Sequence, residues 1–192
     1  MMRVITGSAK GIKLQTPEGE ATRPTSERAK EALFSMIQFE VEGRRVLDLF
    51  AGSGQLGIEA LSRGAGHAVF VDRANAAVQS IRANLQKTKL QASADVYCRE
   101  SISFLRGNTR EKFDLIFLDP PYALGLIPQA LSLLCQQKML LPGALLVCET
   151  GSPDDVFGQE PDLAGIYAIR TQKKHGAAYL TLLEYSEKEK EA

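Results

Sequence analysis

The sequence predicts an α/β fold, a mostly parallel, Rossmann-like sheet of seven strands whose last strands form an antiparallel edge hairpin. From residue 45 onward, short apolar runs alternate with segments of helical periodicity, which is typical of parallel strands joined by helices. Near the end of the chain, two apolar segments instead flank a turn at His175 and Gly176, which favours a hairpin.

The predicted strands are rich in Val, Leu, Ile and Phe, as strands covered on both faces are. They span residues 46–50, 68–72, 94–99, 113–119, 144–150, 166–173 and 177–185. Helices are expected between them, because Val78, Ile81 and Leu85 recur with helical spacing in one segment, and Leu131 and Leu134 do so in another.

The domain prediction is one main domain, 23–186, preceded by a basic arm or strand, 1–22, and followed by a tail, 187–192. Thr25 can cap a helix whose apolar residues, Leu33 among them, follow helical spacing. The tail is a charge run with nothing to bury, so it is expected to be disordered.

Composition favours a soluble protein. Of 192 residues, 44% are hydrophobic and 24% charged, and no apolar stretch approaches the length of a membrane span. The start of the chain has no pattern of a secretory signal, so a cytoplasmic location is expected. The net charge of zero means that any nucleic-acid binding depends on local clusters of cations.

The cysteines and histidines predict no metal site. Cys98, Cys135 and Cys148 lie in apolar segments without metal-ligand spacing, so they are expected to be buried free thiols. His67 and His175 are too few and too isolated for zinc.

A glycine-rich loop joins the first predicted strand to a helix. The segment VLDLFAGSGQLG carries Gly52, Gly54 and Gly57, which allow a sharp turn and a close approach of the backbone to a nucleotide-like ligand. Asp72 ends the next strand twenty residues after Gly52, where a carboxylate can accept hydrogen bonds from ribose hydroxyls. The same spacing occurs in dehydrogenases, so NAD is the first rival ligand.

Three features oppose NAD. Asp48 lies just before the loop, where its charge would repel a pyrophosphate but could face the cationic methionine part of S-adenosylmethionine. The second feature is the edge hairpin, and the third is a motif at the end of the fourth predicted strand.

That motif is FDLIFLDPPY, which puts Asp119, Pro120, Pro121 and Tyr122 just past a buried strand, at the edge where parallel sheets bind ligands. The two prolines stiffen the turn. An exocyclic amine of a base is a poor nucleophile, but acceptors at Asp119 and the Pro120 carbonyl would orient it toward a methyl donor. Tyr122 offers a flat face on which an extruded base can stack.

Together these motifs resemble the bacterial family of small-subunit (16S) ribosomal RNA guanine-N2 methyltransferases, over nearly the whole chain. The strongest blocks are 48–65 and 113–122, and the amino-terminal arm also matches, although Ala9 and Ile12 replace an aromatic and a basic residue. The resemblance implies a class I methyltransferase fold, S-adenosylmethionine as cofactor, and 16S ribosomal RNA in a partly assembled small subunit as partner.

The resemblance implies that Asp72 binds ribose, that Glu100 and Ser101 lie by the adenine, and that Asp119 to Tyr122 take the target base. The expected cofactor-binding residues are Asp48, Phe50, Ala51, Gly52, Gly54, Asp72, Arg73, Glu100, Ser101 and Asp119. The expected RNA-binding residues are Arg3, Lys10, Lys13, Arg23, Thr25, Arg28, Lys173 and Lys174.

The residues themselves leave alternatives open, because adenine and guanine both present a donor amine. Adenine-N6 methylation of RNA or DNA is the nearest enzymatic alternative, and amide methylation of a protein glutamine would usually carry Asn in place of Asp119. A non-catalytic RNA-binding assembly factor is the rival from another class, but a pure binder would not need a carboxylate beside a cofactor loop.

Overall fold

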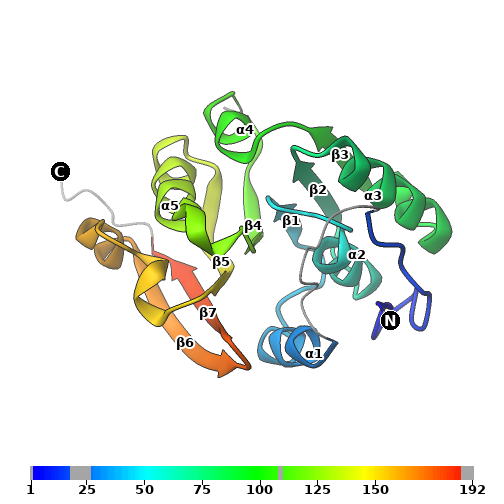
Figure 1. The fold of residues 1–192 in the computed structure, drawn as a ribbon, viewed down its shortest axis with the longest axis horizontal. Helices are drawn as coiled ribbons and strands as arrows, with labels where there is room; N and C mark the ends of the chain where they lie inside the picture. The colour runs from blue at the N-terminus through cyan, green and yellow to red at the C-terminus, as the bar shows by residue number, and fades with distance from the viewer. Residues whose placement is uncertain (1, 18–26, 108–109, 187–192) are drawn as a thin grey trace. The chain divides into compact units, whose positions relative to one another are not determined.

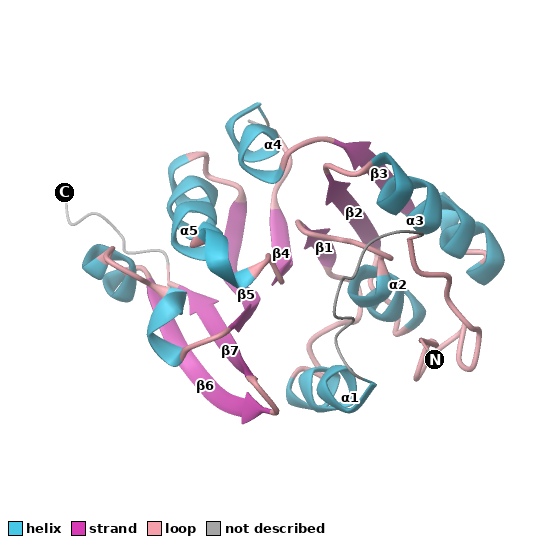
Figure 2. Cartoon of the chain, viewed as in Figure 1, coloured by secondary structure: helices cyan, strands magenta, loops and turns pink. Residues whose placement is uncertain are grey.

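A computed structural model of the chain describes residues 2–17, 27–107 and 110–186. The chain divides into two compact units, Met1–Ser101 and Ile102–Ala192. Each unit combines strands with helices (Figure 1, Figure 2).

The first unit carries a parallel sheet in the order β3-β2-β1. Strands β1 and β2 are buried through apolar residues such as Leu47 and Phe70, and every residue of α2 is buried as well. Its elements are α1 (Glu27–Met36), β1 (Arg45–Asp48), α2 (Gln55–Ser62), β2 (His67–Asp72), α3 (Asn75–Thr88), η1 (Gln91–Ser93) and β3 (Ala94–Cys98).

The second unit carries strands in the order β4-β5-β7-β6, of which β4 and β5 are parallel, while β7 is antiparallel to both β5 and β6. Helix α4 (Ser101–Gly107) starts at the last residue of the first unit. The remaining elements are β4 (Phe113–Leu118), η2 (Tyr122–Leu124), α5 (Leu126–Gln136), β5 (Leu140–Thr150), η3 (Pro153–Val156), η4 (Pro161–Gly165), β6 (Tyr167–His175) and β7 (Ala178–Tyr185).

All seven predicted strands are present, and the hairpin turn falls between His175 and Ala178 as predicted. The largest difference is in β5, which begins at Leu140 instead of residue 144. The strand runs through Pro142 and Gly143. Leu140 pairs with Phe113, and the register then shifts, so that Leu115 pairs with Leu145. A proline and a glycine usually break a strand pattern, which is why the sequence predicted a later start.

The prediction of three buried thiols is wrong for Cys98, which is exposed; Cys135 is half-buried and Cys148 is buried. Cys98 ends β3, which in the first unit pairs with β2 on one side. Apolar neighbours in the sequence therefore did not guarantee burial there, since residues of this strand are half-exposed or exposed.

The amino-terminal arm, described from residue 2 to 17, folds back on itself. Arg3 and Lys13 form an antiparallel bridge, and the Val4 amide donates to the Ile12 carbonyl (3.0 Å). Gly7 holds the arm against α2 with a φ of 87°, and a Cβ at this position would lie 1.7 Å from the Ser62 carbonyl oxygen. This position therefore requires glycine.

A buried ion-pair network fixes the same arm. The Glu59 carboxylate on α2 accepts the amides of Ile5 (2.8 Å) and Thr6 (3.0 Å) and the Nε–H of Arg63 (2.8 Å). Lys30 Nζ lies 3.4 Å from Glu59 Oε2 and donates to the Arg3 carbonyl (2.6 Å). Burial lowers the pKa of Lys30, and the Glu59 charge opposes that shift. The arm is thus joined to two helices by charges that are shielded from water.

Asn84, fully buried on α3, connects the arm to the glycine-rich loop. Its Oδ1 accepts the Gln15 amide (2.7 Å), and its Nδ2 donates to the carbonyls of Gln15 and Ser53 (2.9 Å each). The arm and the glycine-rich loop are therefore both anchored to the same buried side chain.

Candidate functional site

The glycine-rich loop lies between β1 and α2 and is pinned to the end of β2. The Ala51 amide donates to the Val71 carbonyl (3.0 Å), and the Gly52 amide donates to Asp72 Oδ2 (2.8 Å). Gly52 (φ 55°) and Gly54 (φ 76°) are in the left-handed region, where glycine is favoured. The space where a Gly52 side chain would stand is open, so a ligand can approach the backbone there.

The third glycine has a packing role. A Cβ on Gly57 would lie 2.3 Å from the Phe70 ring, so only glycine lets α2 lie this close to β2. Close helix–strand packing is the role that the last glycine of this motif has in dinucleotide-binding folds.

Asp48 is buried beneath the loop, and its Oδ2 accepts the Gly57 amide of α2 (3.0 Å). Burial raises its pKa to about 7, and the Gly57 hydrogen bond opposes the shift. A carboxylate thus takes a backbone donor at the start of α2, where a pyrophosphate would bind in a dehydrogenase. This arrangement supports the sequence argument against NAD.

Replacing Asp48 by Asn is expected to raise the melting temperature more at pH 8 than at pH 5. The raised pKa means that folding favours the protonated carboxyl, so this contribution to stability is present below its unfolded pKa and is lost as the pH rises toward about 7. Asn keeps an acceptor for Gly57 and has no charge to desolvate. Thermal unfolding at both pH values measures the difference, with the exposed Asp154→Asn as control. An equal change at both pH values would contradict the assigned cause.

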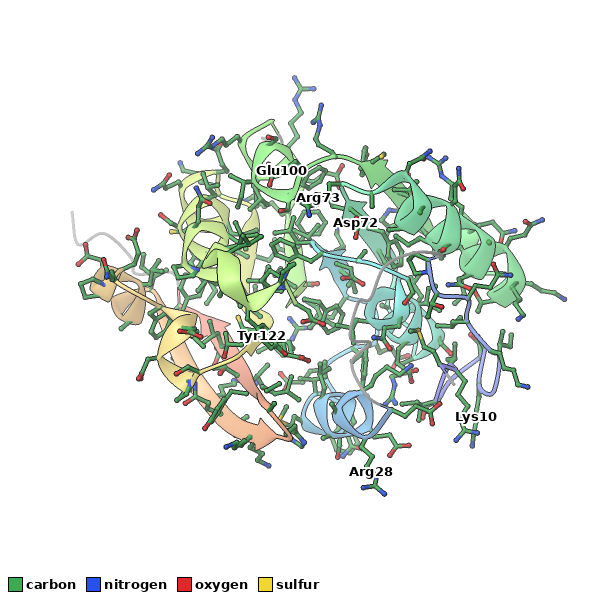
Figure 3. The ribbon with its side chains drawn as sticks, viewed as in Figure 1. Lys10, Arg28, Asp72, Arg73, Glu100 and Tyr122 are labelled. Carbon is green, nitrogen blue, oxygen red and sulfur yellow. The ribbon has the colours of Figure 1, made fainter. Side chains whose placement is uncertain are left out.

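Asp72, half-buried at the end of β2, is ordered by the backbone: Oδ2 accepts the Gly52 amide, and Oδ1 accepts the Ala74 amide (2.9 Å). A carboxylate oxygen has two lone pairs, so each can still accept a ribose hydroxyl. Arg73 beside it is exposed (Figure 3).

The remaining predicted cofactor residues of the first unit flank this edge of the sheet. Phe50 is half-buried and Ala51 is buried within the loop. Ser101, buried at the start of α4, donates from its Oγ to Oε1 of the exposed Glu100 (3.2 Å). This hydrogen bond orients the Ser101 hydroxyl. Ser101 and Glu100 are the two residues expected beside the adenine.

Gln55 was not predicted as a site residue. It begins α2 directly after the glycine-rich loop, it is 8% exposed, and its Oε1 atom is buried without a hydrogen-bond partner among the described residues. Such an acceptor is costly unless a ligand donates to it. Gln55 thus adds an acceptor beside the loop to the carboxylates of Asp48 and Asp72.

The Asp-Pro-Pro-Tyr motif belongs to the second unit and follows β4, as predicted. Asp119 is half-buried and Pro120 is buried, whereas Pro121 and Tyr122 are exposed. The turn into η2 is closed by the Leu124 amide, which bonds to the carbonyl of Pro121 (3.3 Å) and not to that of Pro120.

Tyr122 is held at its hydroxyl, and its side chain is partly exposed. The hydroxyl donates to Glu149 Oε1 (2.5 Å), and the ring packs against Gly151, whose added Cβ would lie 3.4 Å from it. The side chain is nevertheless 40% exposed. An anchored ring that is partly exposed is suited to stacking on a base.

The predicted RNA-binding residues fall into three groups. Lys10, Lys13 and Arg28 are exposed in the first unit, and Arg3 lies 3.5 Å from Glu27, which offsets its charge. In the second unit, the exposed Lys173 and Lys174 lie on β6. Arg23 and Thr25 lie outside the described residues.

The described ranges contain neither a cluster of metal ligands nor a helix that could span a membrane. Within 2–17, 27–107 and 110–186, no three His, Cys, Asp or Glu side chains are grouped to hold a metal ion. No helix in these ranges is long and apolar enough to cross a membrane.

Solved structures define the class of protein. The structure of yhhF from Escherichia coli aligns with a TM-score of 0.83 at 31% identity, covering 96% of this chain and 98% of that one. HI0767 from Haemophilus influenzae aligns with a TM-score of 0.80 at 32% identity, over 97% and 99% of the two chains. An RNA methyltransferase from Salinibacter ruber, solved with S-adenosyl-L-homocysteine, shares the fold at 14% identity (TM-score 0.64, 88% and 97% covered). The fold is that of the S-adenosylmethionine-dependent methyltransferases, as predicted.

The family follows from sequence comparison. The family described as Conserved hypothetical protein 95 matches residues 2–184. Ribosomal RNA small subunit methyltransferase D of Haemophilus influenzae is 40% identical over 151 residues, 78% of each chain. The Escherichia coli K12 protein of that name is 32% identical over 175 residues, 91% of this chain and 85% of its own. The chain belongs to the family described as Conserved hypothetical protein 95. Its similarity to the two methyltransferases confirms the resemblance drawn from its motifs.

Proposed function

We propose that the protein transfers a methyl group from S-adenosylmethionine to the exocyclic N2 amine of a guanine in 16S ribosomal RNA. The Asp119-Pro120-Pro121-Tyr122 turn carries the proposal, because it combines a carboxylate, a backbone carbonyl and a partly exposed aromatic ring in one rigid segment. The names of the relatives support ribosomal RNA as the substrate class.

In the proposal, the first unit holds the methyl donor. Asp72 accepts the ribose hydroxyls, Gln55 and Asp48 face the methionine part, and Ser101 with Glu100 lies beside the adenine. Once bound, S-adenosylmethionine supplies an electrophilic methyl group on a sulfonium centre.

The second unit activates the amine. Asp119 and the Pro120 carbonyl each accept one of the two N–H bonds of the exocyclic nitrogen, which aims its lone pair at the donor. The carboxylate also stabilises the positive charge that develops on the nitrogen as the new N–C bond forms and the bond between the methyl group and sulfur breaks, which leaves S-adenosylhomocysteine. After transfer, the nitrogen proton is acidic and is lost to water, so no strong base is required. Tyr122 stacks on the target base and holds it out of its RNA helix.

Asp72→Ala is expected to weaken S-adenosylmethionine binding by ~1–3 kcal/mol, because the ribose hydroxyls lose a charged acceptor. Removing the carboxylate also frees the Gly52 and Ala74 amides. Asp72→Asn, which keeps one acceptor oxygen, should fall between Ala and the wild type. Calorimetric titration measures the affinity; unchanged binding by the Ala variant would remove Asp72 from the site, and tight NAD binding by the wild type would favour a dehydrogenase.

Methylation of small-subunit particles is expected to be much faster than that of deproteinised RNA. The exposed cations of the arm, Lys10 and Lys13, and those of β6, Lys173 and Lys174, are few. Each neutralised phosphate contributes roughly 0.7 to 0.9 to the salt slope, so naked RNA should bind weakly and with marked salt sensitivity. Ribosomal proteins fix the RNA shape and so supply the rest of the specificity.

Initial rates on particles, deproteinised 16S RNA and DNA, at matched concentration and two salt levels, test this proposal. Charge reversal at Lys10 and Lys13 should raise KM and flatten the salt slope without changing cofactor affinity. Equal or faster methylation of naked RNA would refute the particle context, and methylation of DNA alone would refute ribosomal RNA as the substrate.

A further inference from the structure

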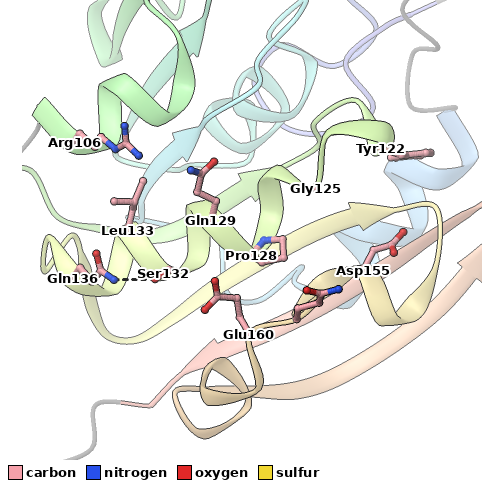
Figure 4. A pocket seen from close by; sticks show the side chains of 12 residues that line it. Arg106, Tyr122, Gly125, Pro128, Gln129, Ser132, Leu133, Gln136, Asp155 and Glu160 are labelled. Atoms are coloured by element: carbon pink, nitrogen blue, oxygen red, sulfur yellow. Dashed lines mark hydrogen bonds between the residues drawn. The ribbon is translucent and has the colours of Figure 1, made fainter.

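A pocket lined by both polar and apolar groups opens beside the catalytic turn, within the second unit. Its volume is about 570 Å³, within the range of small-ligand sites, and Tyr122 forms part of its wall (Figure 4). One wall is the face of α5 that carries Gln129, Ser132 and Gln136, and the opposite wall is the segment from Asp155 to Glu160.

The polar groups of this pocket suit the edge of a nucleobase. Gln129 offers both a donor and acceptors, and neither it nor Glu160 has a side-chain hydrogen bond among the described residues. Gln136 is already oriented, since its Nε2 donates to Ser132 Oγ (3.0 Å). Glutamine and glutamate side chains are groups that read the donors and acceptors of base edges.

The charges indicate which part of a nucleotide would enter. Asp155 and Glu160 bring two negative charges to the lining against the one positive charge of Arg106. A phosphate would be repelled by the acidic side, whereas the amino and imino groups of a base would be accepted there. Arg106, from α4, remains available for a phosphate at the other side (Figure 4).

We infer that this pocket binds the base of the nucleotide next to the methylated one, an inference that rests on the proposed function. A base stacked on Tyr122 is covalently linked to its neighbours, and Tyr122 is also a wall of the pocket. Enzymes that extrude a base commonly select sequence through flanking nucleotides. Gln129 and Glu160 are thus specificity-determining residues for the RNA around the target.

The test is a cycle that combines protein variants with RNA changes. Small-subunit particles are reconstituted from transcribed 16S RNA in which one neighbour of the methylated nucleotide, on either side, is replaced by each other base. Replacing the base of one of the two neighbours should lower the kcat/KM of the wild type about tenfold. Gln129→Ala and Glu160→Gln should each lose about as much on the natural RNA and little more on the changed RNA, because the interaction is already absent.

Gln86→Ala, an exposed glutamine on α3 of the first unit, is the matched control and should behave as the wild type on every RNA. Cofactor affinity should be unchanged in all variants. If the loss from the protein variant and the loss from the RNA change simply add, for both neighbours, the inference is overturned and contact with a ribosomal protein is favoured. Variants that have no effect on kcat/KM would also overturn the inference. A wild type that methylates no ribosomal RNA would overturn the proposed function, and this inference with it.

Discussion

Asp119→Ala is expected to fold and bind S-adenosylmethionine but to lose methyl transfer by about 10²–10³-fold. Removing one group that stabilises charge in a transition state typically costs this much in kcat. Asp119 follows the buried strand β4 and is half-buried, so the change removes an acceptor at the end of the strand and leaves its apolar core intact. Single-turnover kinetics with saturating cofactor isolates the chemical step.

Two comparisons make that result specific. Asp119→Asn keeps one acceptor oxygen but no charge, so its rate should lie between those of Asp119→Ala and the wild type. Asp114→Asn, on the same strand, should leave the chemical step nearly unchanged. A near-normal single-turnover rate in Asp119→Ala would refute the proposed activation of the amine.

Glu59→Gln is expected to lower the free energy of unfolding by about 3–5 kcal/mol, because it leaves the buried Lys30 without its counter-charge. Glu59 also accepts two arm amides and Arg63, so the variant loses charge-assisted hydrogen bonds as well. Lys30→Met should cost less, since the Glu59 carboxylate would keep those three donors.

Urea unfolding of the three proteins measures the difference through the transition midpoint. The exposed Glu31→Gln, on α1 with Lys30, is the control and should change stability little. A Glu59→Gln protein as stable as the wild type would show that the network contributes no net stability.

The strands and the main motifs were predictable because their signals are local. Each apolar run is long enough to mark a buried strand, and the chain passes from strand to glycine-rich loop to helix within twelve residues, 46–57. Asp72 and Asp119 were identifiable because each directly follows such a run. Identifying them therefore required no knowledge of residues far away in the chain.

What the sequence could not give depends on partners far apart in the chain. Glu59 and Lys30 look like ordinary charges of helix surfaces, yet both are buried because the arm covers them. Asn84 and Gln55 are polar residues in amphipathic segments, and only the packed structure shows that one bridges the arm to the loop and the other has a buried free acceptor. Cys98 was misjudged for the converse reason, since the exposure of β3 depends on what packs beside it.

The most direct test of the central claim is the identity of the modified nucleoside. The wild-type protein is incubated with isotope-labelled S-adenosylmethionine and small-subunit particles that lack the modification, and the RNA is digested and analysed by mass spectrometry. The proposal predicts labelled N2-methylguanosine at a single position, and its absence with Asp119→Ala. Labelled N6-methyladenosine would contradict the assignment of the base, and the absence of label from all RNA would contradict the function.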